Sequence, residues 1–226
     1  MNLTEYFNSL PNIDQPYNKY ASYSLAFNNP YKLATSWDAF KYKGFDDYIK
    51  QFIASSGKCI AMPSIFNGEV IAIMFRSCAD KQFRYYTECK YIPYGAGTNN
   101  KMLFTKPWIM VESALDSDFL RNFYPFVIST NGVTVSNNMM SFITGTCSTL
   151  YCGFDNDEAG NNAFSKLCMK YSGKDKQFHI KRLKPPIDVS GKPLKDFGEI
   201  LDCLHNNNSI EYDQYVTSVK ASLMFL

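Results

Sequence analysis

The pattern of apolar and polar residues divides the chain into a β-rich first part and a second part in which strands and helices alternate. In the first part, two runs of β-type residues, CIAMPSIF and EVIAIMFR, are joined by Asn67-Gly68, the strongest two-residue signal for a β-hairpin. Residues 83–86 predict a third strand. Before these strands, prolines interrupt residues 1–56, where only residues 40–53 have spacing close to a helical stripe. We therefore expect a short helical or irregular lead-in followed by a small β-rich subdomain.

Beyond residue 105 the apolar pattern alternates between short strands and helix-like segments. Buried strands are expected at residues 108–111, 126–129, 150–154 and 178–183, with helices near 114–123, 136–145, 158–171 and 196–205. Such alternation is typical of a mostly parallel sheet with right-handed crossovers, and functional groups gather at the carboxyl ends of its strands. The tail from residue 210 predicts one more helix that packs Val216, Leu223 and Phe225 onto the body.

Turn-forming residues at 92–100 mark a boundary between the two parts. The expected organisation is a helical or irregular lead-in, a β-rich basic subdomain, an α/β domain and a C-terminal helical tail, over residues 1–56, 57–104, 105–206 and 207–226. The fold class is therefore α/β, a mostly parallel sheet flanked by helices, with a smaller N-terminal subdomain of β-rich α+β type.

Composition narrows the class of protein. Of the 226 residues, 46% are hydrophobic and 16% aromatic, which excludes an intrinsically disordered chain. The 23 basic and 21 acidic residues give a net charge of +2, which identifies neither a nucleic-acid binder nor a membrane binder. The longest apolar run, residues 70–75, is far short of the roughly 20 residues that cross a bilayer. The seven cysteines show no zinc-ligand spacing and the N-terminus lacks the order of a secretory signal, so we expect reduced thiols in the cytoplasm and no membrane partner.

Three acidic clusters fall where the predicted strands end. VESALD contains Glu112 and Asp116, FDNDEAG contains Asp155 and Asp157, and KDFGE contains Asp196. Two carboxylates about 4 Å apart repel by roughly 4 kcal/mol at an effective dielectric near 20, so crowded acids take up protons or bind a cation. Oxygen-only ligands suit Mg²⁺ or Mn²⁺. The sequence therefore predicts a metal site that draws on these five acids.

Each cluster also has an ordinary structural explanation. Asp196 followed by Glu199 is a helix-capping pair, and Asp155 with Asp157 stabilises a helix N-terminus through its dipole. Three such clusters in the same strand-acid-helix context favour the metal site over three separate caps.

At these residues the sequence resembles the TOPRIM family, which includes DnaG-type and phage-type primases, topoisomerases and some small nucleases. VESALD is similar to the glutamate motif of the family, with Glu112 in the place of the invariant acid, and FDNDEAG is similar to its DxD motif. KDFGEIL resembles the late motif of phage-type primases, and residues 130–134 resemble their glycine-bearing loop. The upstream hairpin and the following KQFRYYTECKY are similar to the β-rich subdomain that precedes TOPRIM in these primases.

The resemblance implies a primase catalytic core that makes short RNA primers on single-stranded DNA by metal-dependent nucleotidyl transfer. It implies Glu112, Asp155 and Asp157 as catalytic residues, and Mg²⁺ or Mn²⁺ held by Glu112, Asp116, Asp155, Asp157 and Asp196. Residues expected to bind nucleoside triphosphate or nucleic acid are Arg76, Arg84, Lys90, Asn131, Gly132 and Lys195. No zinc-binding or helicase module is recognisable, so a replicative helicase or a zinc-binding priming partner is expected on another chain. The usage of Asn, Lys, Tyr and Phe suggests a phage or mobile element, which implies the bacterial host cytoplasm.

Two alternatives stay open from the sequence. A metal-dependent nuclease would use the same acids with water as the nucleophile, and a non-catalytic replication accessory protein would keep the fold without the chemistry. Ser113 and Asn156 stand where many primases have other residues, which loosens the assignment to a subfamily. Two further groups are able to contact single-stranded nucleic acid, although core packing and a solvated face are the commoner explanations: the tyrosines 85, 86, 91 and 94, and the basic stretch 174–184.

Overall fold

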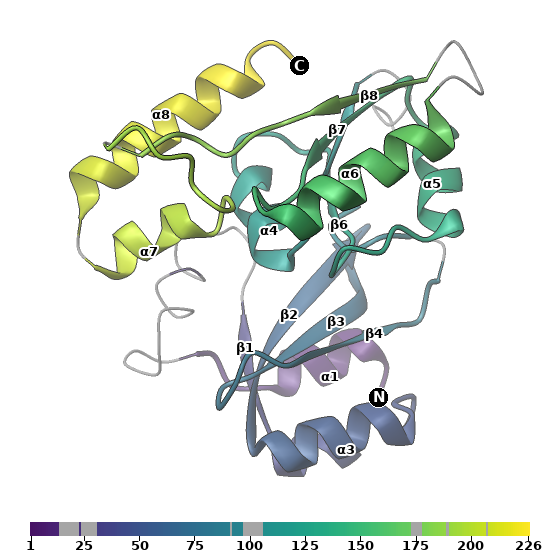
Figure 1. Ribbon diagram of the computed structural model, residues 1–226. Helices are drawn as coiled ribbons and strands as arrows, with labels where there is room; N and C mark the ends of the chain where they lie inside the picture. Colours follow the sequence, from purple (N-terminus) through teal and green to yellow (C-terminus); the bar gives the residue numbers. More distant parts are fainter. Residues whose placement is uncertain are drawn as a thin grey trace. The chain divides into compact units, whose positions relative to one another are not determined.

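The computed structural model describes most of the chain as two compact units, Met1–Lys90 and Tyr91–Leu226 (Figure 1). The described residues are 1–13, 23, 31–90, 92–96, 106–172, 178–188, 190–206 and 208–226. Within these ranges, no helix is both long enough and apolar enough to span a bilayer. The finer division expected from the sequence stays a prediction, and its boundary at residues 104 and 105 lies outside the described residues.

The first unit is built on an antiparallel sheet in the order β1-β2-β3-β4. Its strands are β1 (Lys32–Thr35), β2 (Lys58–Phe66), β3 (Glu69–Ser77) and β4 (Phe83–Thr87). Asn67 and Gly68 adopt φ of 52° and 84° between β2 and β3. Two consecutive residues at positive φ are what a tight hairpin turn of the right twist needs, so the predicted hairpin is confirmed.

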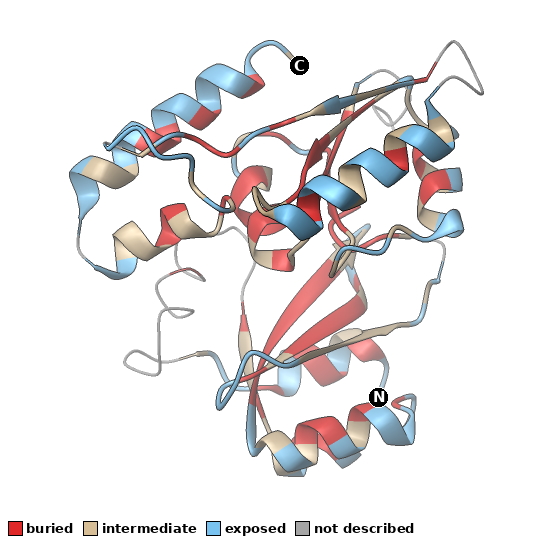
Figure 2. Ribbon diagram, in the orientation of Figure 1, coloured by how far each residue is buried: buried red, intermediate tan, exposed pale blue. Residues whose placement is uncertain are grey.

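The lead-in contributes more regular structure than the sequence predicts. Helix α1 (Leu3–Ser9), the 3-10 helix η1 (Ser36–Phe40) and helix α3 (Asp47–Ser56) accompany β1, which pairs with β2. The expectation missed β1 because its four residues, KLAT, are too few to show a period. Strands β2 and β3 are buried along most of their length (Figure 2), and the ring of Phe45 packs edge-on against Tyr6 and Phe75 at centroid distances of 5.0 and 5.4 Å.

The second unit holds a sheet in the order β6-β5-β7-β8, in which every pairing is parallel. Its strands are β5 (Trp108–Val111), β6 (Val127–Ser129), β7 (Thr149–Gly153) and β8 (His179–Arg182). The helices between and after them are α4 (Ala114–Arg121), α5 (Asn137–Thr144), α6 (Glu158–Tyr171), α7 (Glu199–His205) and α8 (Ser209–Leu223). The predicted alternation and the α/β fold class are confirmed, and the central strand β5 is buried throughout.

The C-terminal helix α8 packs on α7 and buries Tyr215, Val216, Val219 and Leu223. The prediction is therefore right for Val216 and Leu223 and wrong for Phe225, whose side chain is 89% exposed. Phe225 lies beyond the end of the helix, so the helical spacing on which the prediction rested does not extend to it.

Candidate active site

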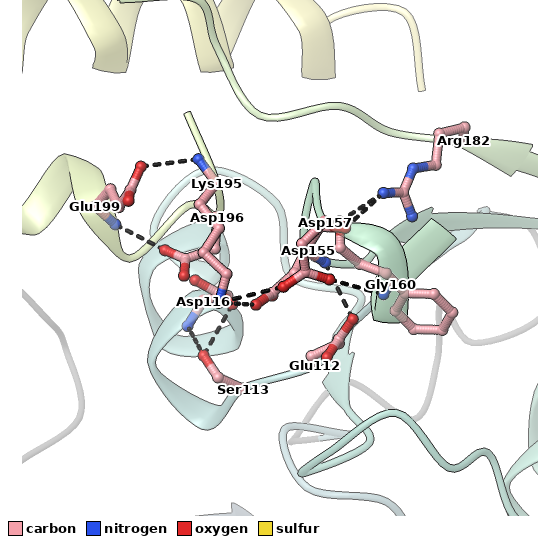
Figure 3. A network of polar contacts seen from close by, with 11 residues as sticks. Glu112, Ser113, Asp116, Asp155, Asp157, Gly160, Arg182, Lys195, Asp196 and Glu199 are labelled. Carbon is pink, nitrogen blue, oxygen red and sulfur yellow. Dashed lines mark hydrogen bonds and ion pairs between the residues drawn. The ribbon is translucent and has the colours of Figure 1, made fainter. Parts of the chain in front are cut away.

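The acids of the three predicted clusters gather near the carboxyl edge of the parallel sheet of the second unit (Figure 3). Glu112 directly follows β5, and Asp155 follows β7, the strand that pairs with β5 through Val111 and Gly153. The two strand ends therefore bring Glu112 and Asp155 together, and the backbone N–H of Asp155 donates to Glu112 Oε1 at 3.1 Å. Burial, and then the nearby Asp155 carboxylate, raise the pKa of Glu112 above its ordinary value.

One ammonium group bridges the two acids of the DxD motif. Lys195 Nζ lies 2.9 Å from Asp155 Oδ2 and 3.4 Å from Asp157 Oδ2. The hydrogen bond to Asp155 raises the pKa of Lys195, so the lysine is charged at every physiological pH. The Lys195 side chain is 51% exposed whereas that of Asp155 is 16% exposed, so this cation is held at the surface of the site.

Asp157 also caps helix α6. Its Oδ1 accepts a hydrogen bond from the backbone N–H of Gly160 at 2.9 Å, and this bond, with the contribution of Lys195, lowers the pKa of Asp157. The capping explanation is therefore confirmed for Asp157, while its other carboxylate oxygen, Oδ2, contacts Lys195 and its role as a metal ligand stays a prediction. Asp157 is an ionised group in a fixed orientation at neutral pH.

Asp116 and Asp196 form a second, more buried pair. Asp116 is 1% exposed, and its Oδ2 accepts from Ser113 Oγ at 2.8 Å. Its Oδ1 has no hydrogen-bond partner of ordinary geometry in the described part of the chain. Burial, followed by the charge of Asp196, raises the pKa of Asp116 well above its ordinary value, and burial followed by Asp155 raises that of Asp196. Oδ1 of Asp196 accepts from Glu199 N at 2.9 Å, as the capping explanation predicts.

Gly160 sits at the closest approach between α6 and the acids. A Cβ at this position would lie 2.2 Å from the Asp155 carbonyl oxygen and 2.8 Å from Glu112 Oε1. Any larger residue has to displace the loop that carries Asp155, so only glycine allows the helix to begin so near Glu112.

Arg182 supports the DxD loop, a role that the sequence reasoning missed. Its Nη2 donates to the carbonyl oxygens of Phe154 and Asp155, each at 2.9 Å. The loop is also tied to the late motif, because the N–H of Asn156 donates to the Lys195 carbonyl oxygen at 2.6 Å. The sequence feature that could have indicated this role is the position of Arg182 near the end of a predicted strand, which in the structure runs parallel to β7.

The loop after β6 is attached to the backbone of Glu112. Asn131 and Gly132 adopt φ of 54° and 133°, and Gly132 N donates to the Glu112 carbonyl oxygen at 2.9 Å. Asn131 Oδ1 accepts from Ser129 Oγ at 2.8 Å. The predicted glycine-bearing loop therefore lies beside the glutamate motif, while its contact with a nucleotide stays a prediction.

The basic candidates Arg76, Arg84 and Lys90 belong to the first unit. The guanidinium of Arg84 lies 4.7 Å from the ring centroid of Tyr48 and 5.0 Å from that of Phe52, and Nη1 donates to the Phe83 carbonyl at 2.7 Å. This arginine therefore has a packing role on α3 in addition to any part in binding.

Of the tyrosines considered for stacking, Tyr94 is buried and its hydroxyl donates to Asp118 Oδ2 at 3.0 Å, so the stacking hypothesis is wrong for this residue. Its ring is enclosed by the second unit and presents no face to a base. Tyr91 and residues 173–177 of the basic stretch lie outside the described residues.

The donor set fits a hard divalent cation in its chemistry. Mg²⁺ uses one or two protein carboxylates and completes its shell with waters and substrate phosphates. Asp155 and Asp157 already share one cationic group, Lys195 Nζ, and Asp116 Oδ1 is buried with no hydrogen-bond donor of ordinary geometry among the described residues. Among the described residues, no three His, Cys, Asp or Glu side chains are close enough to enclose an ion. The pair Asp155 and Asp157 is thus the set that fits, with Lys195 in competition for it.

Comparison with known proteins places this site in a known fold. No curated protein sequence matches the chain, but residues 109–200 match the Toprim-like family model. A DnaG primase catalytic domain bound to single-stranded DNA is similar with a TM-score of 0.52 and 13% identity, over 91% of this chain and 78% of that one. The Escherichia coli primase catalytic core is similar with a TM-score of 0.51 and 12% identity, over 89% of this chain and 71% of that one.

A longer protein is also among the matches. The Aquifex aeolicus primase, with zinc-binding and RNA polymerase domains, matches 71% of this chain at 16% identity and a TM-score of 0.47. This chain spans 40% of its length. The expected resemblance and fold class are confirmed. Residues 109–200 match the Toprim-like family model, and the chain is similar in fold to DnaG-type primase catalytic cores.

Proposed function

We propose that this protein is a primase-type nucleotidyltransferase that synthesises short RNA primers on a single-stranded DNA template. The observation that carries the proposal is the meeting of the glutamate and DxD motifs at one sheet edge of a Toprim-like domain, where Asp155 and Asp157 share a cation. Mg²⁺ or Mn²⁺ held by these two carboxylates would neutralise charge at the reacting phosphate and at the leaving pyrophosphate.

In this reaction the 3′-hydroxyl of the growing primer attacks the α-phosphorus of a nucleoside triphosphate. The new P–O bond forms as the bond to the bridging β-phosphate oxygen breaks, and pyrophosphate leaves. Glu112, whose pKa is raised by burial and by Asp155, is suited to receive the hydroxyl proton near neutral pH. The half-exposed Lys195 supplies a cation for the triphosphate, and the Asp116–Asp196 pair supplies further ligand oxygens when it is ionised.

The test is a priming assay with single-stranded DNA, labelled ribonucleotides and Mg²⁺ or Mn²⁺. The Asp155→Ala and Asp157→Ala variants are expected to lose about 10²–10³-fold or more of the activity, the scale of removing one group that stabilises the transition-state charge. Asp188→Ala is the matched control, because Asp188 is an acid of the same unit that lies in a turn and bonds Ser190.

The products separate the proposal from its alternatives. Template-dependent oligoribonucleotides that vanish in Asp155→Ala support a primase. Shortened DNA identifies a nuclease instead, and binding without any product identifies an accessory protein. A zinc-binding priming partner or a replicative helicase on another chain belongs to the same proposal, and its addition is expected to raise primer yield.

A further inference from the structure

Helix α6 lines a cavity that the acidic site leaves unused. The cavity has a volume of about 440 Å³ and lies between residues 133–135 and one face of α6. Its apolar lining consists of Val133, Val135, Ala159, Ala163 and Leu167, and its polar lining of Thr134, Asn162, Lys166, Lys170 and Tyr171. The lining thus includes two lysines and no acid, which makes the cavity a site for an anion with an apolar part.

Neither lysine forms an ion pair with an acid among the described residues. Lys170 Nζ donates to Asn137 Oδ1 at 2.9 Å and lies 5.1 Å from the ring centroid of Tyr171, and both partners are neutral. Lys166 is exposed, and no acid lies within ion-pair distance of it in the described ranges. These lysines therefore present two unpaired positive charges at the rim of the cavity.

The position of the cavity along α6 links it to the acidic site. Asp157 caps the N-terminus of this helix, and the cavity extends from Ala159 in the first turn to Tyr171 at the last residue. At about 1.5 Å per residue, Asp157 and Lys170 are about 20 Å apart along the axis. The helix thus has Asp157 of the acidic site at its N-terminus and two lysines toward its C-terminus.

We infer that this cavity binds a phosphate-bearing nucleotide unit of the single-stranded nucleic acid that runs to the acidic site. Lys166 and Lys170 contact its phosphates, and the base lies against Val133, Val135 and Ala163. That the ligand belongs to a single-stranded nucleic acid rests on the proposed function. That the cavity prefers an anion with an apolar ring rests on its lining residues alone. A free nucleotide has the same chemistry, so the experiment must distinguish the two sources.

The experiment measures binding of a labelled single-stranded oligodeoxynucleotide, and separately of ATP, in EDTA across a range of salt concentrations. EDTA removes the metal, so binding in the cavity is measured independently of catalysis. Removal of two phosphate contacts in the Lys166→Ala/Lys170→Ala variant is expected to weaken oligonucleotide binding about tenfold. It should also reduce the slope of log K against log salt by about 1.4, because each single-strand contact contributes about 0.7.

Two matched controls test charge and shape. Lys192→Ala/Lys220→Ala removes the same total charge from exposed lysines of the same unit that do not line the cavity, and it should leave the slope unchanged. Ala163→Phe fills the cavity without changing charge and should also weaken binding, whereas Ser165→Phe adds the same ring to the exposed side of α6 and should not. Circular dichroism confirms that each variant is folded.

The outcomes have distinct meanings. An unchanged slope in the cavity double variant, an equal change in the control pair, or equal effects of the two phenylalanine variants would overturn the site. Loss of ATP binding with oligonucleotide binding intact would overturn the strand as the occupant. If the expected binding changes occur while the priming assay yields no RNA, the cavity stands and the proposed function fails.

Discussion

At the scale of single residues, Lys195 supplies the positive charge that offsets the carboxylates of the acidic site. Without it, Asp155 and Asp157 face each other with no bridging cation. We expect Lys195→Ala to lower the melting temperature in EDTA, because the two carboxylates lose their ion pair. The variant should bind Mn²⁺ up to about fivefold more tightly, because the metal no longer has to displace an exposed ion pair of up to about 1 kcal/mol. Affinity for nucleoside triphosphate should fall. Manganese electron paramagnetic resonance and thermal unfolding with and without Mn²⁺ measure these effects.

Lys192→Ala is the control for this prediction, since Lys192 lies in the same segment and pairs with neither acid of the DxD motif in the described structure. Weaker Mn²⁺ binding by Lys195→Ala than by the control would show that the lysine organises the carboxylates and does not compete with the metal.

At Gly160, substitution by alanine is expected to change stability in the opposite direction from that usual in a helix. Alanine in place of glycine within a helix ordinarily stabilises by about 1 kcal/mol. Here the added Cβ meets the Asp155 carbonyl oxygen at 2.2 Å, so we expect Gly160→Ala to lower both the melting temperature and the priming rate. Ser165→Ala, on the exposed side of the same helix, is expected to stabilise slightly, because alanine has a higher helix propensity than serine. A Gly160→Ala variant that is more stable than the wild type and equally active would contradict the close packing.

At the scale of elements, η1 inverts the usual placement of side chains. Asp38 is 3% exposed and Trp37 is 83% exposed. Asp38 Oδ2 accepts from Thr35 N and Oγ1 at 2.7 and 2.8 Å, and Lys41 Nζ lies 2.6 Å from Oδ1. Burial by itself raises the pKa of Asp38, but these three donors together outweigh it, so the pKa is lowered.

The sign of this shift gives a pH-dependent prediction. A carboxyl whose folded pKa is lowered contributes stability above its unfolded pKa, about 3.9, and that stability is lost as pH falls through the folded value. Asp38→Asn should therefore lower the free energy of unfolding at pH 7, and its difference from the wild type should shrink below about pH 4. Urea unfolding at several pH values measures this difference. Trp37→Ala is expected to change stability little at any pH, and a pH-independent effect of Asp38→Asn would contradict the account.

The same elements show what the sequence could predict. Periodicity located the β2–β3 hairpin and all four strands of the parallel sheet, because each is long or apolar enough to show its pattern. It missed β1, whose four residues pair with β2 only through tertiary contact, and it placed Phe225 in a helix that ends before it. The site was predicted in part. Motif spacing identified the acids, whereas the bridge by Lys195 and the support by Arg182 come from three-dimensional proximity that spacing does not encode.

At the scale of the whole molecule, a net charge of +2 conceals local fields of opposite sign. Acids crowd one sheet edge of the second unit, while the cavity on α6 carries two lysines and no acid. The first unit contributes Arg76 on β3 and Arg84 on β4, which sequence reasoning treated alike. The guanidinium of Arg84 packs over the rings of Tyr48 and Phe52, so the loss of this side chain affects packing as well as charge.

Alanine substitution tests each arginine separately. Arg84→Ala should lower the melting temperature, because it removes a side chain that covers two aromatic rings, and its activity should fall only as far as its folded fraction does. If Arg76 binds the triphosphate, as the sequence predicts, Arg76→Ala should lose about 10- to 100-fold in kcat/KM for nucleoside triphosphate, mainly through KM, the scale of losing about 1.5–3 kcal/mol of charged hydrogen bonding. Lys50→Ala, a basic residue of the same unit on α3, controls for charge. Steady-state priming kinetics and thermal unfolding separate the two effects. If Arg76→Ala keeps the KM of the wild type, Arg76 makes no contact with the triphosphate.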